Sequence, residues 1–162
     1  MSDSNNSLAF DGRYLGSLLI LRLTLGGFLF LWAIEKFIIP GTVVSIYRNF
    51  FFGIVDGTTI TYAIGAVLTI MSLAYIIGAY KRWVYLYGFI IHAISVASSW
   101  NRIIDPYGLI EPSGFLEKGD LFRGKPEHLF LASVPVLAGF WLLYVMRDRD
   151  TKWCTRFGND AG

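Results

Sequence analysis

The segment YLGSLLILRLTLGGFLFLWAIEKF, residues 14–37, decides the fold class of this chain. A helix of about 20 mostly apolar residues crosses the roughly 30 Å hydrocarbon core of a bilayer. The segment is long enough for that. Its apolar residues surround the helix instead of forming one stripe, which disfavours a helix that lies on a membrane surface. We therefore predict that residues 14–37 form a membrane-spanning helix.

Three further apolar segments follow, at about 59–80, 83–100 and 129–146. Only Lys81 and Arg82 separate the first two of them, so those two helices are expected to be antiparallel neighbours. Trp83 and Trp100 bracket the third span at a spacing that fits the two aromatic belts of a membrane helix. The sequence thus predicts an all-α fold, a four-transmembrane-helix bundle that forms a single membrane domain over residues 1–162.

The composition supports a membrane protein and excludes several other classes. Hydrophobic residues make up 54% and charged residues 16% of the chain. An average soluble domain has about 25% charged residues, so a soluble enzyme is excluded. The single cysteine, Cys154, rules out a disulfide framework, a Cys-x-x-Cys redox pair and a thiolate metal cage. A net charge of +2 without a long basic run gives no support for nucleic-acid binding.

The placement of lysine and arginine predicts the orientation in the membrane. The short segments on one side are rich in these residues: Arg13, Lys81, Arg82, Arg147, Arg149, Lys152 and Arg156. The basic residues of the opposite loops, 38–58 and 101–128, are diluted among acidic ones. We predict a multi-pass protein of the inner (plasma) membrane with both termini in the cytoplasm. Residues 1–13 lack the basic n-region of a signal peptide, so the first span is expected to stay in the mature protein.

The two outer loops differ in character. Loop 38–58 is too apolar for a free loop and too short and broken for a span, so we predict a short interfacial helix with Phe50, Phe51 and Phe52 turned toward lipid or a partner. Loop 101–128 contains three prolines and four glycines, which break regular structure. A loop of that length is typical of a docking surface or a lid.

Arg22 and His92 are the ionisable residues that lie deepest in the predicted spans, and buried ionisable groups in a membrane need a reason. Arg22 either extends toward the cytoplasmic headgroups or faces the bundle interior and binds a carbonyl, carboxylate or headgroup. His92 shares one helix face with Gly88, Ser95 and Ser99. Such a small and polar stripe is expected to face protein.

For His92 three roles stay open at this point: an ordinary packing histidine, a contact to a quinone, or a metal or haem ligand. No second histidine lies at its depth, so we predict no haem and no metal. Ser72 in the second span lies at a related depth and can complete a polar pocket. The predicted ligand-binding residues are therefore Arg22, His92, Ser95 and Ser72.

Two further residues of the spans carry expectations. Lys36 lies about 40° around the first helix from Arg22, so the two cations share nearly the same face; with Trp32 nearby, interfacial anchoring explains it equally well. Pro135 removes a backbone hydrogen bond from the fourth span and is expected to kink it.

Short motifs in the first span carry a family resemblance. They are Leu21-Arg22-Leu23, Leu25-Gly26, Phe30-Leu31-Trp32 and Glu35-Lys36-Phe37. These motifs resemble the first helix of DoxX-type membrane proteins, and the order of apolar segments over residues 14–147 is similar. Where many members have His-Gly, this chain has Trp32-Ala33. The resemblance implies a four-helix membrane bundle, and it carries over only Arg22, Gly26 and Lys36.

What the resemblance implies about function leaves two hypotheses open. Some DoxX-type relatives are small subunits of thiosulfate:quinone oxidoreductase, which implies a small redox-associated subunit that contacts membrane quinone and has no catalytic residue of its own. The alternative is a non-catalytic accessory subunit that packs against a larger respiratory or oxygenase complex, or a homo-oligomer. Solute transport is disfavoured because no carboxylate lies in mid-membrane to couple protons.

Overall fold

The structure, a computed structural model, describes residues 2–50, 57–104 and 128–155, with side chains from residue 12 in the first range and from residue 130 in the last. Within these ranges the chain is all-helical and has no strand, which confirms the all-α prediction. The helices are α1 (Ser2–Ile38), α2 (Pro40–Phe50), α3 (Thr58–Ile77), α4 (Lys81–Ser98), α5 (Trp100–Ile104) and α6 (His128–Val145).

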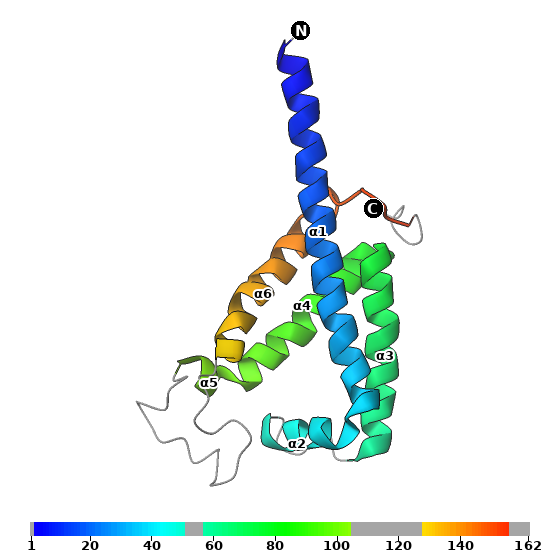
Figure 1. Cartoon of the computed structure of the whole chain (residues 1–162), viewed down its shortest axis with the longest axis vertical. Helices are drawn as coiled ribbons and strands as arrows, with labels where there is room; N and C mark the ends of the chain where they lie inside the picture. Colours follow the sequence, from blue (N-terminus) through cyan, green and yellow to red (C-terminus); the bar gives the residue numbers. More distant parts are fainter. Residues whose placement is uncertain (1, 51–56, 105–127, 156–162) are drawn as a thin grey trace.

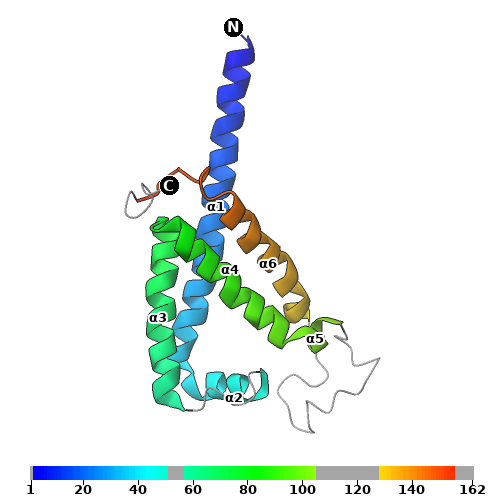
Figure 2. The same ribbon diagram turned by 180° about the vertical axis from the view of Figure 1, so that it is seen from behind.

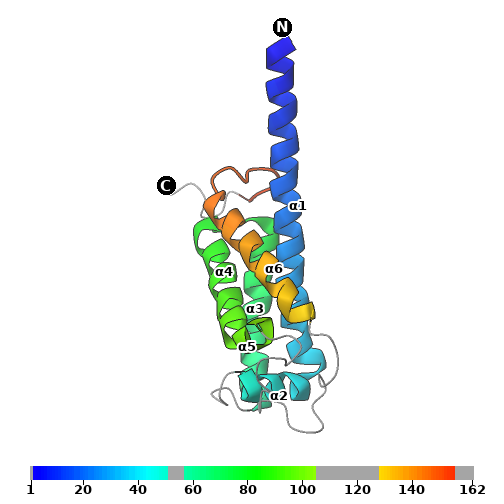
Figure 3. The ribbon, with the colours of Figure 1, turned by 90° about the vertical axis from the view of Figure 1, so that its left-hand side faces the viewer.

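The four long helices form two pairs. α1 packs mainly against α3, and α4 packs mainly against α6. In Figure 1 the chain runs down α1, up α3, down α4 and up α6, so that both pairs are antiparallel. Figure 2 shows α4 crossing α1 at an angle. In the side view of Figure 3 these four helices lie together, while the first turns of α1 project beyond them.

The two pairs meet in an apolar core to which each long helix contributes. Its buried members are Leu18, Leu25, Leu29, Tyr75, Val84, Tyr85, Phe140 and Leu143. Glycine allows the close approach of α1 to α3, since a Cβ on Gly26 would lie 2.6 Å from Ile76 Cγ1. A Cβ on Gly88 of α4 would likewise lie 2.8 Å from Tyr75 Cε2. The core therefore depends on small residues at the helix crossings.

The helix ends differ from the expected spans in ways that local geometry explains. α1 begins well before residue 14, because nothing in the preceding residues breaks a helix. α3 ends at Ile77, three residues earlier than expected, because Gly78 caps it in the left-handed region with φ +66. α4 begins at Lys81, since the carbonyl of Tyr80 accepts the first hydrogen bonds of that helix from Trp83 and Val84.

Short helices lie at the end of the bundle that is opposite to the chain termini, which we call the α2 end. The predicted short helix in loop 38–58 is present as α2, which lies across this end (Figure 1) and buries Val43, Val44 and Tyr47. The ring of Phe50 contacts that of Phe130 in α6, 5.8 Å between centroids. α5 corrects the expectation of an irregular loop from residue 101. Phe51, Phe52 and residues 105–127 lie outside the described residues.

Two of the described helices, over Gly12–Ile38 and Thr58–Ile77, are long and apolar enough to cross a membrane. The apolar part of α6, Phe130–Val145, is shorter, and α6 continues through Pro135 as one helix. Large apolar side chains are exposed around the bundle, such as Leu31 and Ile70, both 67% exposed. Contiguous apolar exposure of this kind marks an interaction or membrane surface.

Adjacent glycines in α1 give a matched test of the α1–α3 contact. Gly26→Ala must displace Ile76, including its backbone nitrogen at 3.3 Å, whereas a Cβ on Gly27 meets no atom within 4 Å. We expect Gly26→Ala to lower the free energy of unfolding by about 1–3 kcal/mol through overpacking. Gly27→Ala should raise it by up to about 1 kcal/mol through helix propensity. Unfolding in detergent micelles measures both, and equal effects would contradict the packing.

Candidate functional site

Arg22 lies inside the bundle and forms an ion pair with the C-terminal segment. Its side chain is 1% exposed and that of Asp150 is 0% exposed. Nη1 of Arg22 donates to both carboxylate oxygens of Asp150, at 3.0 and 2.9 Å. Of the two alternatives for Arg22, the structure therefore supports the inward one, with a carboxylate as the partner. Extension toward the headgroups is contradicted by the burial of the side chain.

Further hydrogen bonds extend this pair into what we call the Arg22 cluster, made of Arg22, Lys81, Tyr85, Asp150 and Cys154. The hydroxyl of Tyr85 donates to Asp150 Oδ2 at 2.6 Å. Nζ of Lys81 donates to the Asp150 carbonyl at 3.1 Å. Nη2 of Arg22 donates to the carbonyls of residues 152 and 153, at 2.8 and 3.2 Å. A charge pair this well hydrogen-bonded is compensated for its loss of hydration.

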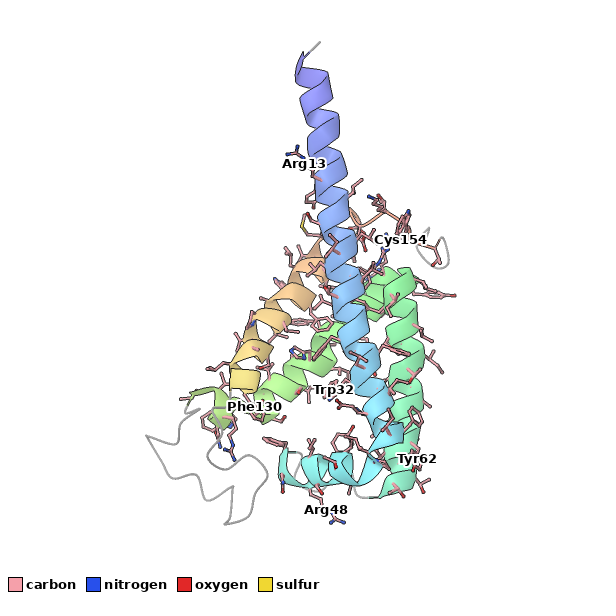
Figure 4. The ribbon with its side chains drawn as sticks, viewed as in Figure 1. Arg13, Trp32, Arg48, Tyr62, Phe130 and Cys154 are labelled. Atoms are coloured by element: carbon pink, nitrogen blue, oxygen red, sulfur yellow. The ribbon has the colours of Figure 1, made fainter. Side chains whose placement is uncertain are left out.

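The Arg22 cluster lies where α3 ends and α4 begins, at the end of the bundle that we call the cluster end. A Cβ on Gly78 would lie 2.8 Å from Cys154 Sγ and 2.9 Å from Arg22 Nη1, so glycine is required there for space as well as for its φ of +66. The Thr155 amide donates to the Ile77 carbonyl at 3.1 Å. In Figure 4, Cys154 lies beside α1 near the end of α3.

Cys154 is held within the cluster and is a poor nucleophile there. Its thiol donates to the Asp150 carbonyl at 3.0 Å and accepts a hydrogen bond from Arg22 Nη1. Burial, together with the nearby Asp150 carboxylate, raises the pKa of the thiol above its ordinary value. A smaller thiolate fraction means slower thiol chemistry. The role that the contacts of the cluster support is structural, because they join α1 and α4 to the C-terminal segment.

His92 lies in a different environment, among aromatic rings. It is 3% exposed. Its ring contacts Phe28 edge-on at 5.5 Å and Phe140 at 5.2 Å between centroids. Nε2 lies 3.0 Å from the Ser133 carbonyl of α6, which can only accept, so Nε2 carries the proton. Nδ1 is buried and has no hydrogen-bond partner among the described residues.

The polar stripe on α4 faces protein, as predicted: Gly88, His92 and Ser99 are buried and Ser95 is half-buried. The Ser95 carbonyl accepts from the hydroxyls of Ser98 and Ser99, both at 2.9 Å. Ser72 is fully buried, and its hydroxyl donates to the Thr69 carbonyl of its own helix at 2.9 Å. No described hydrogen bond joins either serine to Arg22 or His92.

Arg22 and His92 are thus at two separate places rather than in one pocket. Tyr85, which binds the partner of Arg22, precedes His92 by seven residues, or about 10 Å along α4. A column of rings links the two places: Tyr75 lies 4.7 Å from Tyr85 and 5.8 Å from Phe140, which contacts His92. The Tyr75 hydroxyl in this column is buried without a hydrogen-bond partner among the described residues.

Lys36 is the second buried cation of α1, on the inward face as its helical position predicted. It is 1% exposed, and its stem packs against Gly65 of α3. The ammonium turns back by one helical turn, donating to the Trp32 carbonyl at 2.8 Å and lying 4.6 Å from the centre of the Trp32 ring. No carboxylate of a described residue lies within ion-pair distance of it.

These three residues differ in what they can do chemically. Arg22 has its charge neutralised by the protein itself. His92 presents an unused lone pair at Nδ1, which can accept a hydrogen bond from a ligand. Lys36 has N–H groups beyond the one that Trp32 accepts. Trp32, which points from α1 toward the side where α4 passes (Figure 4), stacks on Phe28 at 6.4 Å, so Lys36 and His92 lie at the two ends of one aromatic row.

Sequence reasoning missed Asp150 and Tyr85. Asp150 is an acidic residue in a basic tail, and the predicted topology already put that tail at the same end of the bundle as Arg22. That signal was available, since a buried arginine calls for a carboxylate. Tyr85 lies one turn into α4, where a tyrosine is also typical of an ordinary interfacial residue.

A double-mutant cycle tests the Arg22–Asp150 pair. Arg22→Met and Asp150→Leu each leave one buried charge unpaired, so each should cost about 3–5 kcal/mol of unfolding free energy. The double variant should recover on the order of 2 kcal/mol or more of the summed loss. The pair of Arg147 and Asp148, whose side chains are 29% and 82% exposed, is the control, because Arg147→Met should change stability by less than about 1 kcal/mol. Additive losses would show that the two residues do not interact.

Lys36 should behave in the opposite way. Lys36→Met keeps the length of the side chain and removes a buried charge that lacks a described counter-ion, so we expect stability to rise by on the order of 1 kcal/mol. Thermal unfolding in an uncharged detergent measures this. Arg13→Met, at an exposed position of the same helix, should have no effect and serves as the control. A loss of stability in Lys36→Met would mean that the ammonium supports the fold.

Comparisons with known proteins add no family to this description. No protein-family model, no curated protein and no solved structure matches the chain. The resemblance to DoxX-type proteins therefore rests on the short motifs of the first span and on the order of the apolar segments. The function has to be argued from the buried groups themselves.

Proposed function

We propose that the chain is a multi-pass protein of the inner membrane, with α1, α3, α4 and α6 as four spans. The two helices of sufficient length and hydropathy are α1 and α3, and α4 and α6 pack on that pair. The exposed apolar side chains around the bundle support contact with lipid. The basic residues gather at the cluster end, which supports both termini being cytoplasmic.

We further propose that the bundle contacts membrane quinone, as a small subunit of a redox complex. The observation that carries this is His92, whose Nδ1 lone pair is buried, unused and flanked by the rings of Phe28 and Phe140. A quinol hydroxyl is a donor that fits such an acceptor, and aromatic side chains offer stacking surfaces for its ring. In this arrangement the neutral imidazole acts as the hydrogen-bond acceptor that positions the quinol hydroxyl.

In this proposal the predicted ligand residues have separate roles and do not line one pocket. Arg22 serves the fold, because Asp150 already neutralises it. Ser72 and Ser95 remain candidates by their position in the bundle, and the hydrogen bonds described for them are with their own helices. His92 is the residue on which quinone binding depends. The electron acceptor for the quinol, or the donor to the quinone, belongs in this proposal to a partner subunit.

An accessory subunit without ligand is the second candidate. The Arg22 cluster favours it, because both terminal nitrogens of Arg22 and the carboxylate of Asp150 are used in joining α1, α4 and the C-terminal segment. In that case the His92–Ser133 contact serves only to join α4 to α6. The two candidates differ in whether His92 is needed for a ligand or for assembly.

Substitution of His92 separates these candidates. Purified in mild detergent, the native chain and its partners should carry co-purified quinone, measured by solvent extraction and chromatography. His92→Leu should reduce bound quinone about tenfold or more, the equivalent of one hydrogen bond of about 1.4 kcal/mol. His92→Gln should retain more, since its amide both donates and accepts.

Ser99→Ala is the matched control on the same helix face, because the Ser99 hydroxyl donates to carbonyls of its own helix, and it should leave bound quinone unchanged. Quinol-dependent turnover of the complex should follow the quinone content of each variant. Unchanged quinone and turnover in His92→Leu, with the complex intact, would leave the accessory role as the better description.

A further inference from the structure

Two described residues other than glycine have a positive φ, and both are exposed aromatics. Tyr80 has φ 48 and is 53% exposed, and Trp153 has φ 55 and is 78% exposed. The left-handed region is strained for a bulky side chain and normally falls to glycine or asparagine. Strain of this kind persists only where the surrounding structure imposes it, and it concentrates at functional positions.

The two residues lie on neighbouring segments at the cluster end. The Thr155 amide bonds to the Ile77 carbonyl at 3.1 Å, and Lys81 Nζ bonds to the Asp150 carbonyl at 3.1 Å. The backbone holds both conformations in place: the Tyr80 carbonyl accepts from the amides at the start of α4, and the Trp153 carbonyl accepts from Arg22 Nη2. Because main-chain atoms are fixed inward, the two rings are presented outward.

Basic residues adjoin these two residues in the sequence. Arg82 is exposed, and its guanidinium lies 5.5 Å from the ring centre of Trp83, itself 64% exposed. Lys152 and Arg149 are exposed as well. Of the nearby acids, Asp150 is buried and neutralised by Arg22, and Asp148 lies 3.8 Å from Arg147. We call Tyr80, Arg82, Trp83, Lys152 and Trp153 the aromatic–basic surface.

We propose that the aromatic–basic surface binds the headgroups of anionic phospholipids in the leaflet at the cluster end. Tryptophan and tyrosine favour the headgroup level, where the ring is apolar and its N–H or O–H is hydrated. Lysine and arginine beside them are attracted to anionic lipids. The surface lies where α3 ends and α4 begins, the level at which a spanning helix leaves the hydrocarbon. The inference rests on the membrane placement of the bundle and is independent of quinone binding.

The test uses the full chain in micelles of an uncharged detergent, to which phosphatidylglycerol or, for comparison, phosphatidylcholine is added. Phosphatidylglycerol should raise the unfolding midpoint of the native chain and phosphatidylcholine should not. Trp153→Gly and Trp153→Ala should both lose at least half of that rise. In plain detergent the glycine variant should unfold about 2–4 °C above the alanine variant, because only glycine relieves the strain.

Charge is tested separately from strain. Lys152→Gln combined with Arg82→Gln should weaken the response to phosphatidylglycerol at least about fivefold, since each basic residue contributes to attraction by anionic lipid. Trp141→Ala removes an exposed tryptophan from the regular helix α6, at 51% exposure, and should keep the full response. This variant is the control for loss of any lipid-facing ring.

Three outcomes would overturn the proposal. An equal rise with phosphatidylcholine would show that the surface does not recognise charge. A full response to phosphatidylglycerol in both Trp153 variants would show that the ring takes no part. Loss of a co-purified protein from the variants, with the lipid response intact, would assign the surface to a protein partner instead.

Discussion

The ion pair of Arg22 with Asp150 is the interaction on which the rest of this structure depends. It joins the first helix to the segment that follows the last one, with both side chains at most 1% exposed. A guanidinium buried in a bundle of apolar helices is tolerated only when a carboxylate neutralises it. The pair therefore determines where the C-terminal segment lies, and through Tyr85 it also determines the register of α4 against α1.

Space around that pair constrains the neighbouring backbone. Gly78 must lack a side chain, because a Cβ would contact both Cys154 and Arg22. The carbonyls of residues 152 and 153 must turn toward Nη2, which holds Trp153 in a strained conformation. The buried charge of Arg22 thus accounts for the glycine at position 78, for the inward carbonyls of residues 152 and 153, and for the positive φ of Trp153.

Much of the helical layout could be predicted from the sequence, because it depends on local patterns. The apolar segment 14–37 indicated α1, and the alternation of small and polar residues around His92 indicated an inward face, which the burial of α4 confirms. Local patterns did not indicate the end of a helix where the backbone conformation of one residue sets that end. Gly78 ends α3 early through its left-handed conformation. A short helix such as α5 has too few residues for a periodic pattern.

The candidate site was predictable only in part, for a physical reason. An inward Arg22 was one of two alternatives that its position on the helix left open, and its partner lies 128 residues away, where residue spacing does not identify the contact. His92 was correctly expected to face protein. The separation of His92 from Arg22 could not be predicted, because the depth of a residue along its span does not tell which side chains lie between two spans. The rings of Tyr75 and Phe140 lie between these two residues.

The contrast between the two ends of the bundle indicates where function should be sought. At the cluster end, the charges of Arg22 and Asp150 are matched, and such a network mainly stabilises the fold. Toward the α2 end, Lys36 lacks a described carboxylate partner and His92 has an unused acceptor, with Phe28 and Trp32 between them. A buried acceptor without a partner lowers stability, and Nδ1 of His92 is such a group among the described residues. A ligand that donates to Nδ1 would remove that cost, and this argument holds whichever ligand that is.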